Sequence, residues 1–190
     1  MAFNLWRAQA SDAPRVARVH VDSWQVAYRG VVPDSFLEGF TYAKREDAFR
    51  RSLAENLEET YLLEDEDATA SSDERAVAIL TVGPSRDDDL DVKEVGELWG
   101  IYIVPDRWRQ GIGTRLVREA EGMLRARGYR EIVLWVLEGN MDARRFYEAM
   151  GFEPDGASRI VELGEPLPAV RYRKAVEPRV TEGATHEGRV

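Results

Sequence analysis

The chain contains no cysteine, which excludes disulfides, thiolate metal sites and a cysteine acyl-enzyme. Its histidines are His20 and His186 alone, so no metal site is expected. No run of about 18 apolar residues occurs, and no basic segment followed by an apolar one opens the chain. A membrane span and a signal peptide are therefore not expected, which favours a cytoplasmic protein without a membrane partner.

Basic residues are also outnumbered, with 26 Lys and Arg against 35 Asp and Glu and a net charge of −9. A nucleic-acid partner is not expected, because binding to phosphates requires a basic face. An acidic surface weakly favours cationic substrates, although solubility is the simpler explanation. The length of 190 residues predicts one domain, over residues 1–176. Residues 177–190 contain almost no large apolar side chain and are predicted to be a disordered tail.

Hydrophobic periodicity predicts an alternation of strands and helices. Apolar runs and alternating patterns predict strands at residues 3–8, 59–64, 76–82, 97–104, 131–137, 158–163 and 170–176. Helical spacing and capping residues predict helices at residues 12–28, 34–40, 42–56, 111–128 and 140–150. The acidic connections at residues 64–75 and 85–94 are expected to be solvated loops.

Residues 94–128 form the most informative stretch, read as strand, glycine turn and helix. Gly111 and Gly113 lie at the start of the helix, where their missing β-carbons would let a ligand approach the backbone. Free N–H groups and the helix dipole at this position suit a pyrophosphate. Leu116 stands where a dinucleotide fingerprint requires its third glycine, and no Gly-Lys-Ser/Thr ending makes a P-loop. A glycine turn without a ligand is the alternative.

Two blocks resemble the GNAT superfamily of N-acetyltransferases. Residues 101–117 resemble its acetyl-CoA-binding motif, and a second block downstream has the family's spacing. That block consists of Asn140, Ala143, Phe146, Tyr147, Gly151 and Phe152. Trp108 departs from the pattern, because the family usually has Gln or Arg at that position. The resemblance covers residues 3–175 and is strongest over 94–152.

The resemblance implies a single α/β domain with a mixed, mostly antiparallel sheet of six or seven strands. The sheet would be splayed at its central strands and covered by helices on both faces. The implied activity is transfer of an acetyl group from acetyl-CoA to a primary amine, by direct attack in a ternary complex. A small amine such as a polyamine, an aminoglycoside or an amino-acid derivative is the favoured acceptor. A protein or peptide acceptor and a non-catalytic acyl-CoA sensor are the alternatives, and a homodimer is common in the family.

The resemblance also implies roles for individual residues. Tyr147 matches the general acid that protonates the leaving thiolate. Glu97 matches a glutamate that acts as the base, directly or through water, with His20 as the other candidate. Gly100, inside an otherwise bulky strand, is expected at a bulge or a close ligand approach. The residues expected to bind acetyl-CoA are Ile101, Ile103, Arg109, Gln110, Gly111, Ile112, Gly113, Thr114 and Asn140.

Aromatic residues of the N-terminal region are the candidates for the acceptor pocket. Residues 24–33 resemble a family pattern that forms the roof of that pocket. Trp24 and Tyr28 are therefore expected to line it, together with Phe36 and Phe40. Packing of these rings between the helices and the sheet is the alternative.

Overall fold

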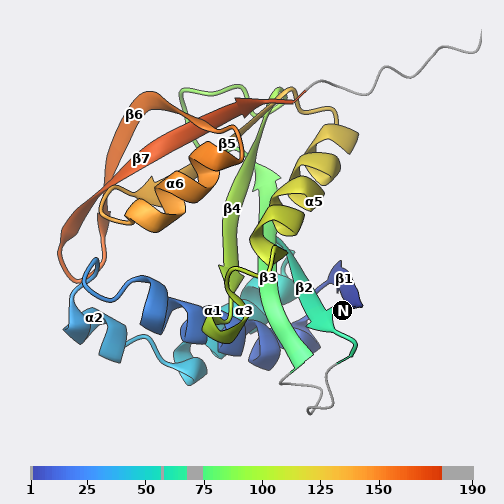
Figure 1. Cartoon of the computed structure of the whole chain (residues 1–190), viewed down its shortest axis with the longest axis vertical. Helices are drawn as coiled ribbons and strands as arrows, with labels where there is room; N and C mark the ends of the chain where they lie inside the picture. The colour runs from blue at the N-terminus through green and yellow to red at the C-terminus, as the bar shows by residue number, and fades with distance from the viewer. Residues whose placement is uncertain (1, 57, 68–74, 177–190) are drawn as a thin grey trace, which may run out of the picture.

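A computed structural model describes residues 2–56, 58–67 and 75–176, which form one seven-stranded sheet in the order β1-β2-β3-β4-β5-β7-β6 (Figure 1). The predicted tail at residues 177–190 and the middle of the acidic connection at 64–75 lie outside the described residues. The strands are β1 (Phe3–Arg7), β2 (Glu59–Asp65), β3 (Ala76–Pro84), β4 (Val95–Ile103), β5 (Glu131–Leu137), β6 (Glu153–Glu162) and β7 (Pro166–Ala175).

All neighbouring strands are antiparallel except β4 and β5, which run parallel and pair only briefly. Their register covers Val95–Glu97 of β4 against Glu131–Val133 of β5. Beyond that point β4 continues along β3 as far as Ile103, while β5 continues along β7 as far as Leu137. The two central strands therefore diverge and leave a wedge in the sheet, which confirms the predicted splay.

A β-bulge lies in β4 where the wedge opens. Thr81 of β3 pairs with Gly100, and Val82 pairs with Leu98, so Trp99 is the additional residue. A β-carbon on Gly100 would lie 2.8 Å from Cε2 of Tyr102. Gly100 is thus required by the aromatic ring two residues further along the strand, beside the expected bulge.

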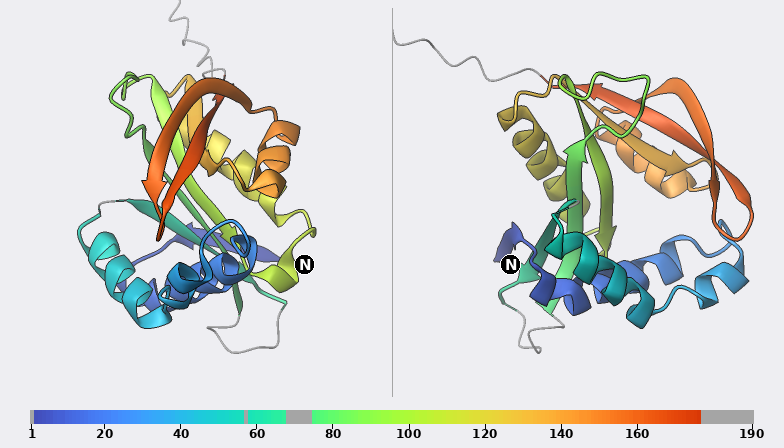
Figure 2. Two further views of the ribbon diagram at one scale, coloured as in Figure 1. Left: turned by 90° about the vertical axis from the view of Figure 1, so that its left-hand side faces the viewer. Right: turned by 180° about the vertical axis from the view of Figure 1, so that it is seen from behind.

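Helices cover both faces of the sheet, as predicted (Figures 1 and 2). One face carries α1, α2 and α3, and the other carries α5 and α6. No helix in the described part of the chain is long and apolar enough to cross a membrane. The bounds are α1 (Ala13–Ala27), α2 (Asp34–Glu38), α3 (Tyr42–Ala54), α5 (Ile112–Ala126) and α6 (Met141–Ala149), with 3₁₀ turns at Ala10–Asp12 and Pro105–Arg107.

The core lies between the sheet and the helices on each face. Leu62, Leu80 and Leu134 of the strands and Leu116 of α5 are fully buried in the main cluster. Burial of each such side chain stabilises the fold by about 1.5–3 kcal/mol. A second, smaller cluster joins Leu37 of α2 to Trp24 of α1, Leu137 of β5 and Ala169 of β7.

Three sequence-based expectations about strands and loops were wrong. Strand β7 begins at Pro166 rather than at residue 170, because the turn after β6 is short and residues 166–168 already pair with β6. Strand β6 begins at Glu153 rather than at residue 158, because an exposed edge strand tolerates Pro154 through a register shift before Ser158. The acidic connection at residues 85–94 is only partly solvated. The side chain of Asp87 is 9% exposed and accepts hydrogen bonds from Trp135 and Arg171.

Candidate active site

The wedge between β4 and β5 opens into a cavity of about 890 Å³. Its lining comes from β4 and β5, the end of α1, the loop before α5 and the first turns of α5 and α6. Elements far apart in the sequence meet here only because the two central strands separate. The cavity is the candidate site.

The loop before α5 has the backbone geometry of an anion cradle. Arg109 and Gly111 both have left-handed backbone angles, with φ of 59° and 81°. Gly111 is the N-cap of α5, and a β-carbon there would meet no atom within 4 Å. The helical hydrogen bonds begin with Arg115 N–H donating to the Gly111 carbonyl at 3.1 Å. The backbone N–H groups of residues 110–114 therefore have no acceptor among the residues that the structure describes, and they suit a pyrophosphate.

Two side chains of this loop do not face the cavity. The Gln110 amide donates to the Asp106 carbonyl at 3.0 Å, and Ile112 is 3% exposed in the core. These two residues can contribute only backbone groups to the cradle. Arg109, Gly113 and Thr114 line the cavity directly.

Gly113 has a packing role as well. A β-carbon there would lie 3.1 Å from Cζ of Phe146 and 3.5 Å from Cδ1 of Ile103. The missing side chain lets the start of α5 approach both α6 and β4. Gly113 therefore allows α5, α6 and β4 to pack closely between the cradle and the wedge.

Trp108, the departure from the family motif, is tied to the end of β4. Its indole Nε1 donates to the Ile103 carbonyl at 2.7 Å, and the ring lines the cavity with 39% of the residue exposed. Positive charge at the cavity comes instead from Arg29, Arg109 and Arg145. Sequence reasoning missed Arg145, which lies two residues before Tyr147 on α6.

The backbone of Ile101 and Ile103 faces the wedge. Val104 N–H donates to the Val77 carbonyl at 3.0 Å, and hydrogen bonding to the partner alternates along an antiparallel strand. The N–H and C=O groups of Ile101 and Ile103 therefore point away from β3, toward the gap. The Ile103 carbonyl is occupied by Trp108 Nε1 and by the Ser23 hydroxyl at 2.8 Å, whereas the two N–H groups are oriented to receive a ligand carbonyl.

Tyr147 lies on α6 and lines the cavity opposite β4. Its ring packs beside Phe146 and Phe152, with centroids 5.1 and 5.9 Å away. Burial, and secondarily the nearby Tyr102, raise the pKa of the Tyr147 phenol well above its usual value near 10. The group therefore keeps its proton at neutral pH and can act as a proton donor.

Asn140 and Tyr28 meet at one side of the cavity. Asn140 caps α6, and its Oδ1 accepts from the Ala143 N–H at 3.2 Å. The Tyr28 phenol interacts with Asn140, while burial raises the pKa of Tyr28 well above its usual value. Both residues line the cavity, where sequence reasoning expected them.

Glu97 does not line the cavity. It is 1% exposed, and Arg86 holds its carboxylate from the side. Glu97 Oε2 accepts from the Arg86 backbone N–H at 3.0 Å and from Arg86 Nε at 3.2 Å, and Arg86 Nη2 contacts Oε1. Direct proton abstraction from an acceptor in the cavity does not fit this arrangement, so a role as base is limited to one through water.

Trp24 does not line the cavity, but it contacts Tyr28, which does. Its ring packs on Tyr28 and Phe40, with centroids 4.2 and 4.5 Å away, and Phe36 belongs to the same cluster. Of these four predicted pocket residues only Tyr28 reaches the cavity.

His20 is also part of the aromatic packing. Its Nδ1 accepts from Arg45 Nε at 3.2 Å, and its ring lies 4.4 Å from that of Tyr102. Burial, and then the charge of Arg45, lower the pKa of His20 well below 6.5. A neutral imidazole held in this way serves structure rather than proton transfer at the cavity.

Comparisons with known proteins agree with this geometry. The sequence profile of the acetyltransferase (GNAT) family matches residues 24–152. The chain is 28% identical to the uncharacterized N-acetyltransferase YuaI of Bacillus subtilis, over 88% of this chain and 87% of that protein. The PaiA N-acetyltransferase of Thermoplasma acidophilum, solved with coenzyme A, has the same fold, with a TM-score of 0.64 and 20% identity over 92% and 99% of the two chains. The yncA protein of Salmonella typhimurium, solved with acetyl-CoA, matches with a TM-score of 0.64 and 14% identity over 97% and 99%.

Proposed function

Because the chain belongs to the GNAT family of acetyltransferases, we propose that it acetylates the primary amine of a small molecule by direct attack in a ternary complex. Acetyl-CoA is the co-substrate, and it supplies the acetyl thioester. One observation supports the proposal above all others. The splay of β4 and β5 brings the glycine cradle, the open edge of β4 and Tyr147 to one cavity.

The cradle and β4 hold the co-substrate at its two ends. The N–H groups of residues 110–114 bind the pyrophosphate, with Arg109 and Arg145 adding positive charge. The N–H groups of Ile101 and Ile103 orient the pantetheine arm and the thioester carbonyl. A backbone donor aimed at the developing oxyanion contributes about 3 kcal/mol to stabilising the transition state.

Tyr147 protonates the leaving thiolate. A phenol with a pKa near ~10 is a weaker acid than a thiol with a pKa near ~8.5, so transfer of its proton to the thiolate is uphill and requires the hydroxyl to be held in contact with the sulfur as the thiolate leaves. The raised pKa keeps Tyr147 protonated at neutral pH but makes the transfer more uphill, so the contact between the hydroxyl and the sulfur decides whether Tyr147 acts as the acid.

The cavity itself assists deprotonation of the amine. Burial in a low-dielectric site disfavours an ammonium ion, and aromatic rings make up much of the wall. Glu97 stays a predicted base through water. A cytoplasmic location, a possible homodimer and the absence of nucleic-acid or membrane partners also stay predictions from the sequence.

The experiment measures thiol release from acetyl-CoA against a panel of amines and short peptides, with Tyr147→Phe in parallel. The variant keeps the ring packing and removes the hydroxyl, so kcat should fall by about 10²- to 10⁴-fold. The dissociation constant for acetyl-CoA, measured by calorimetry, should stay the same. Unchanged kcat in the variant would remove Tyr147 from the mechanism. Acetyl-CoA binding without turnover on any amine would favour the sensor alternative.

A further inference from the structure

The cavity has two faces of different chemistry. Leu134 of β5 pairs with Tyr172, whose hydroxyl contacts Glu148 of α6 at 2.8 Å. Side chains alternate between the two faces of a strand, so Trp135 lies on the opposite face, away from α6 and the cradle. Trp135 lines the cavity from that face.

β4 contributes two aromatic rings to the same face. Gly96 faces α5, since a β-carbon there would lie 2.9 Å from Leu124. Side chains alternate along the strand, so Glu97 faces away from α5, and so does Gly83, which pairs with Glu97 across the sheet. The Trp99 ring lies 2.9 Å from the position of a β-carbon on Gly83. Tyr102 lies 4.4 Å from His20 of α1, centroid to centroid. We call Tyr28, Trp99, Tyr102 and Trp135, which all line the cavity, the aromatic face.

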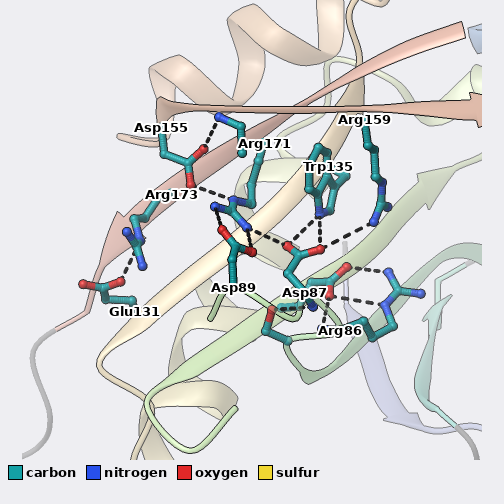
Figure 3. Close-up of polar contacts among 12 residues, drawn as sticks. Arg86, Asp87, Asp89, Glu131, Trp135, Asp155, Arg159, Arg171 and Arg173 are labelled. Carbon is teal, nitrogen blue, oxygen red and sulfur yellow. Dashed lines mark hydrogen bonds and ion pairs between the residues drawn. The ribbon is translucent and has the colours of Figure 1, made fainter. Parts of the chain in front are cut away.

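The Trp135 indole is held rigidly (Figure 3). Its Nε1 donates to both carboxylate oxygens of Asp87, at 3.0 and 3.2 Å. The guanidinium of Arg159 lies over the ring, 4.1 Å from its centroid, and itself lies 3.6 Å from Asp87. Asp87 is anchored in turn by Arg171 at 3.0 Å. The ring therefore cannot rotate without breaking a buried polar network.

Trp99 is covered in the same way. The guanidinium of Arg86 lies 4.1 Å from the centroid of its ring, and its Nε1 donates to the Pro84 carbonyl at 3.2 Å. Each indole thus already has an arginine on one ring face. The face of each indole that Arg86 or Arg159 covers is therefore not available to a second cation.

Carboxylates are nearly absent from the lining. Among the described residues that line the cavity, Asp142 is the only acidic one, and it lies in the first turn of α6, away from the aromatic face. Arg29, at the end of α1, also lines the cavity. A buried ammonium group without an acidic partner is strongly disfavoured.

We propose that the acceptor is a monoamine on a flat, aromatic body, which packs against Trp99 and Trp135 and directs its amine into the wedge. This inference rests on the proposed function and narrows it, because it disfavours the polyamines and aminoglycosides that the acidic composition suggested. Offset or edge-to-face contacts between rings supply the selectivity. Asp87 is a positioning residue, which acts through Trp135.

Calorimetry on the full protein saturated with coenzyme A tests the inference without requiring turnover. The probes are tryptamine, hexylamine as a monoamine without a flat body, and spermidine as a polycation. Tryptamine should bind about tenfold more tightly than hexylamine, and spermidine should bind more weakly than either. Spermidine binding as tightly as tryptamine would overturn the inference. Tryptamine binding without acetylation would overturn the proposed function alone.

Variants of Trp135, in the aromatic face, and of Asp87, which holds it, provide a second test. Trp135→Leu should raise the tryptamine dissociation constant about tenfold and leave that of hexylamine unchanged, while Trp135→Phe should restore most of the loss. Asp87→Asn weakens the hydrogen bonds that fix the Trp135 indole, so the KM for tryptamine should rise while the KM for acetyl-CoA stays constant. Asp89→Asn is the matched control, because Asp89 binds the same Arg171 but does not touch Trp135. Equal effects of the two aspartate variants on tryptamine would refute the positioning role.

Discussion

Arg171 is the residue whose removal should destabilise the fold most clearly. It is 5% exposed in β7 and binds three aspartates from two distant segments (Figure 3). Its Nε donates to Asp155 at 2.6 Å, its Nη1 to Asp87 at 3.0 Å, and its two terminal nitrogens to Asp89 at 2.8 Å each. The perturbation is Arg171→Met, which keeps much of the apolar stem and removes the cation.

The expected loss follows from the burial of its partners. The side chains of Asp87 and Asp155 are 9% and 11% exposed, so removal of Arg171 leaves carboxylates out of water without their main cation. Breaking a buried ion pair from one side costs about 3–5 kcal/mol. Asp89 is 64% exposed on its side chain and adds little, since exposed pairs contribute about 0–1 kcal/mol.

Urea unfolding followed by circular dichroism measures the effect, with thermal unfolding as a second readout. Arg171→Met should lower the free energy of unfolding by about 3–5 kcal/mol and the melting temperature by about 10 °C. Asp89→Asn, the control, should change it by less than about 1 kcal/mol. A loss below about 1 kcal/mol in Arg171→Met would refute the argument that Arg171 compensates buried charge.

Three further predictions concern the cradle, His20 and Glu97. Gly111→Asp should abolish acetyl-CoA binding in calorimetry while Gly111→Asn binds, because both residues tolerate a left-handed backbone and only Asp adds negative charge; equal affinities would refute the cradle. The pKa of His20 is lowered in the fold, so the unfolded chain takes up the proton first as the pH falls. The free energy of unfolding of the wild type, measured in urea, should therefore decrease below about pH 6.5, and that of His20→Gln should depend less on pH. The same pH dependence in both proteins would contradict the burial argument. If Glu97 acts as a base through water, Glu97→Gln should displace the ascending limb of the pH profile of kcat/KM. An unchanged limb would show that the carboxylate, which Arg86 holds outside the cavity, takes no part in proton transfer.

Local patterns in the sequence were sufficient for the elements and for the class of fold. β5 has the predicted bounds, and the other strands and helices lie where their apolar runs and periodic faces predict them, except that β6 and β7 begin earlier. The resemblance over residues 94–152 supplied the cradle and Tyr147, and the fold and the family are confirmed. These features were predictable because each depends on a short, contiguous segment, such as a glycine turn at a helix start.

The environment of individual side chains was decided only by tertiary structure. Glu97 was predicted from its place in a strand, but its burial against Arg86 depends on how the chain turns between β3 and β4. Trp99 enters the cavity because a bulge shifts the alternation of β4, which no spacing rule along one strand reveals. Asp87 and Arg171 lie 84 positions apart in the sequence, and an acidic loop looks solvated until its partner is brought to it. The sequence by itself predicted the cradle, the central strand and the tyrosine, because each is a local pattern. The divergence of two strands, the cross-strand register and long-range ion pairs determined which side chains face the cavity, since these are properties of packing between segments.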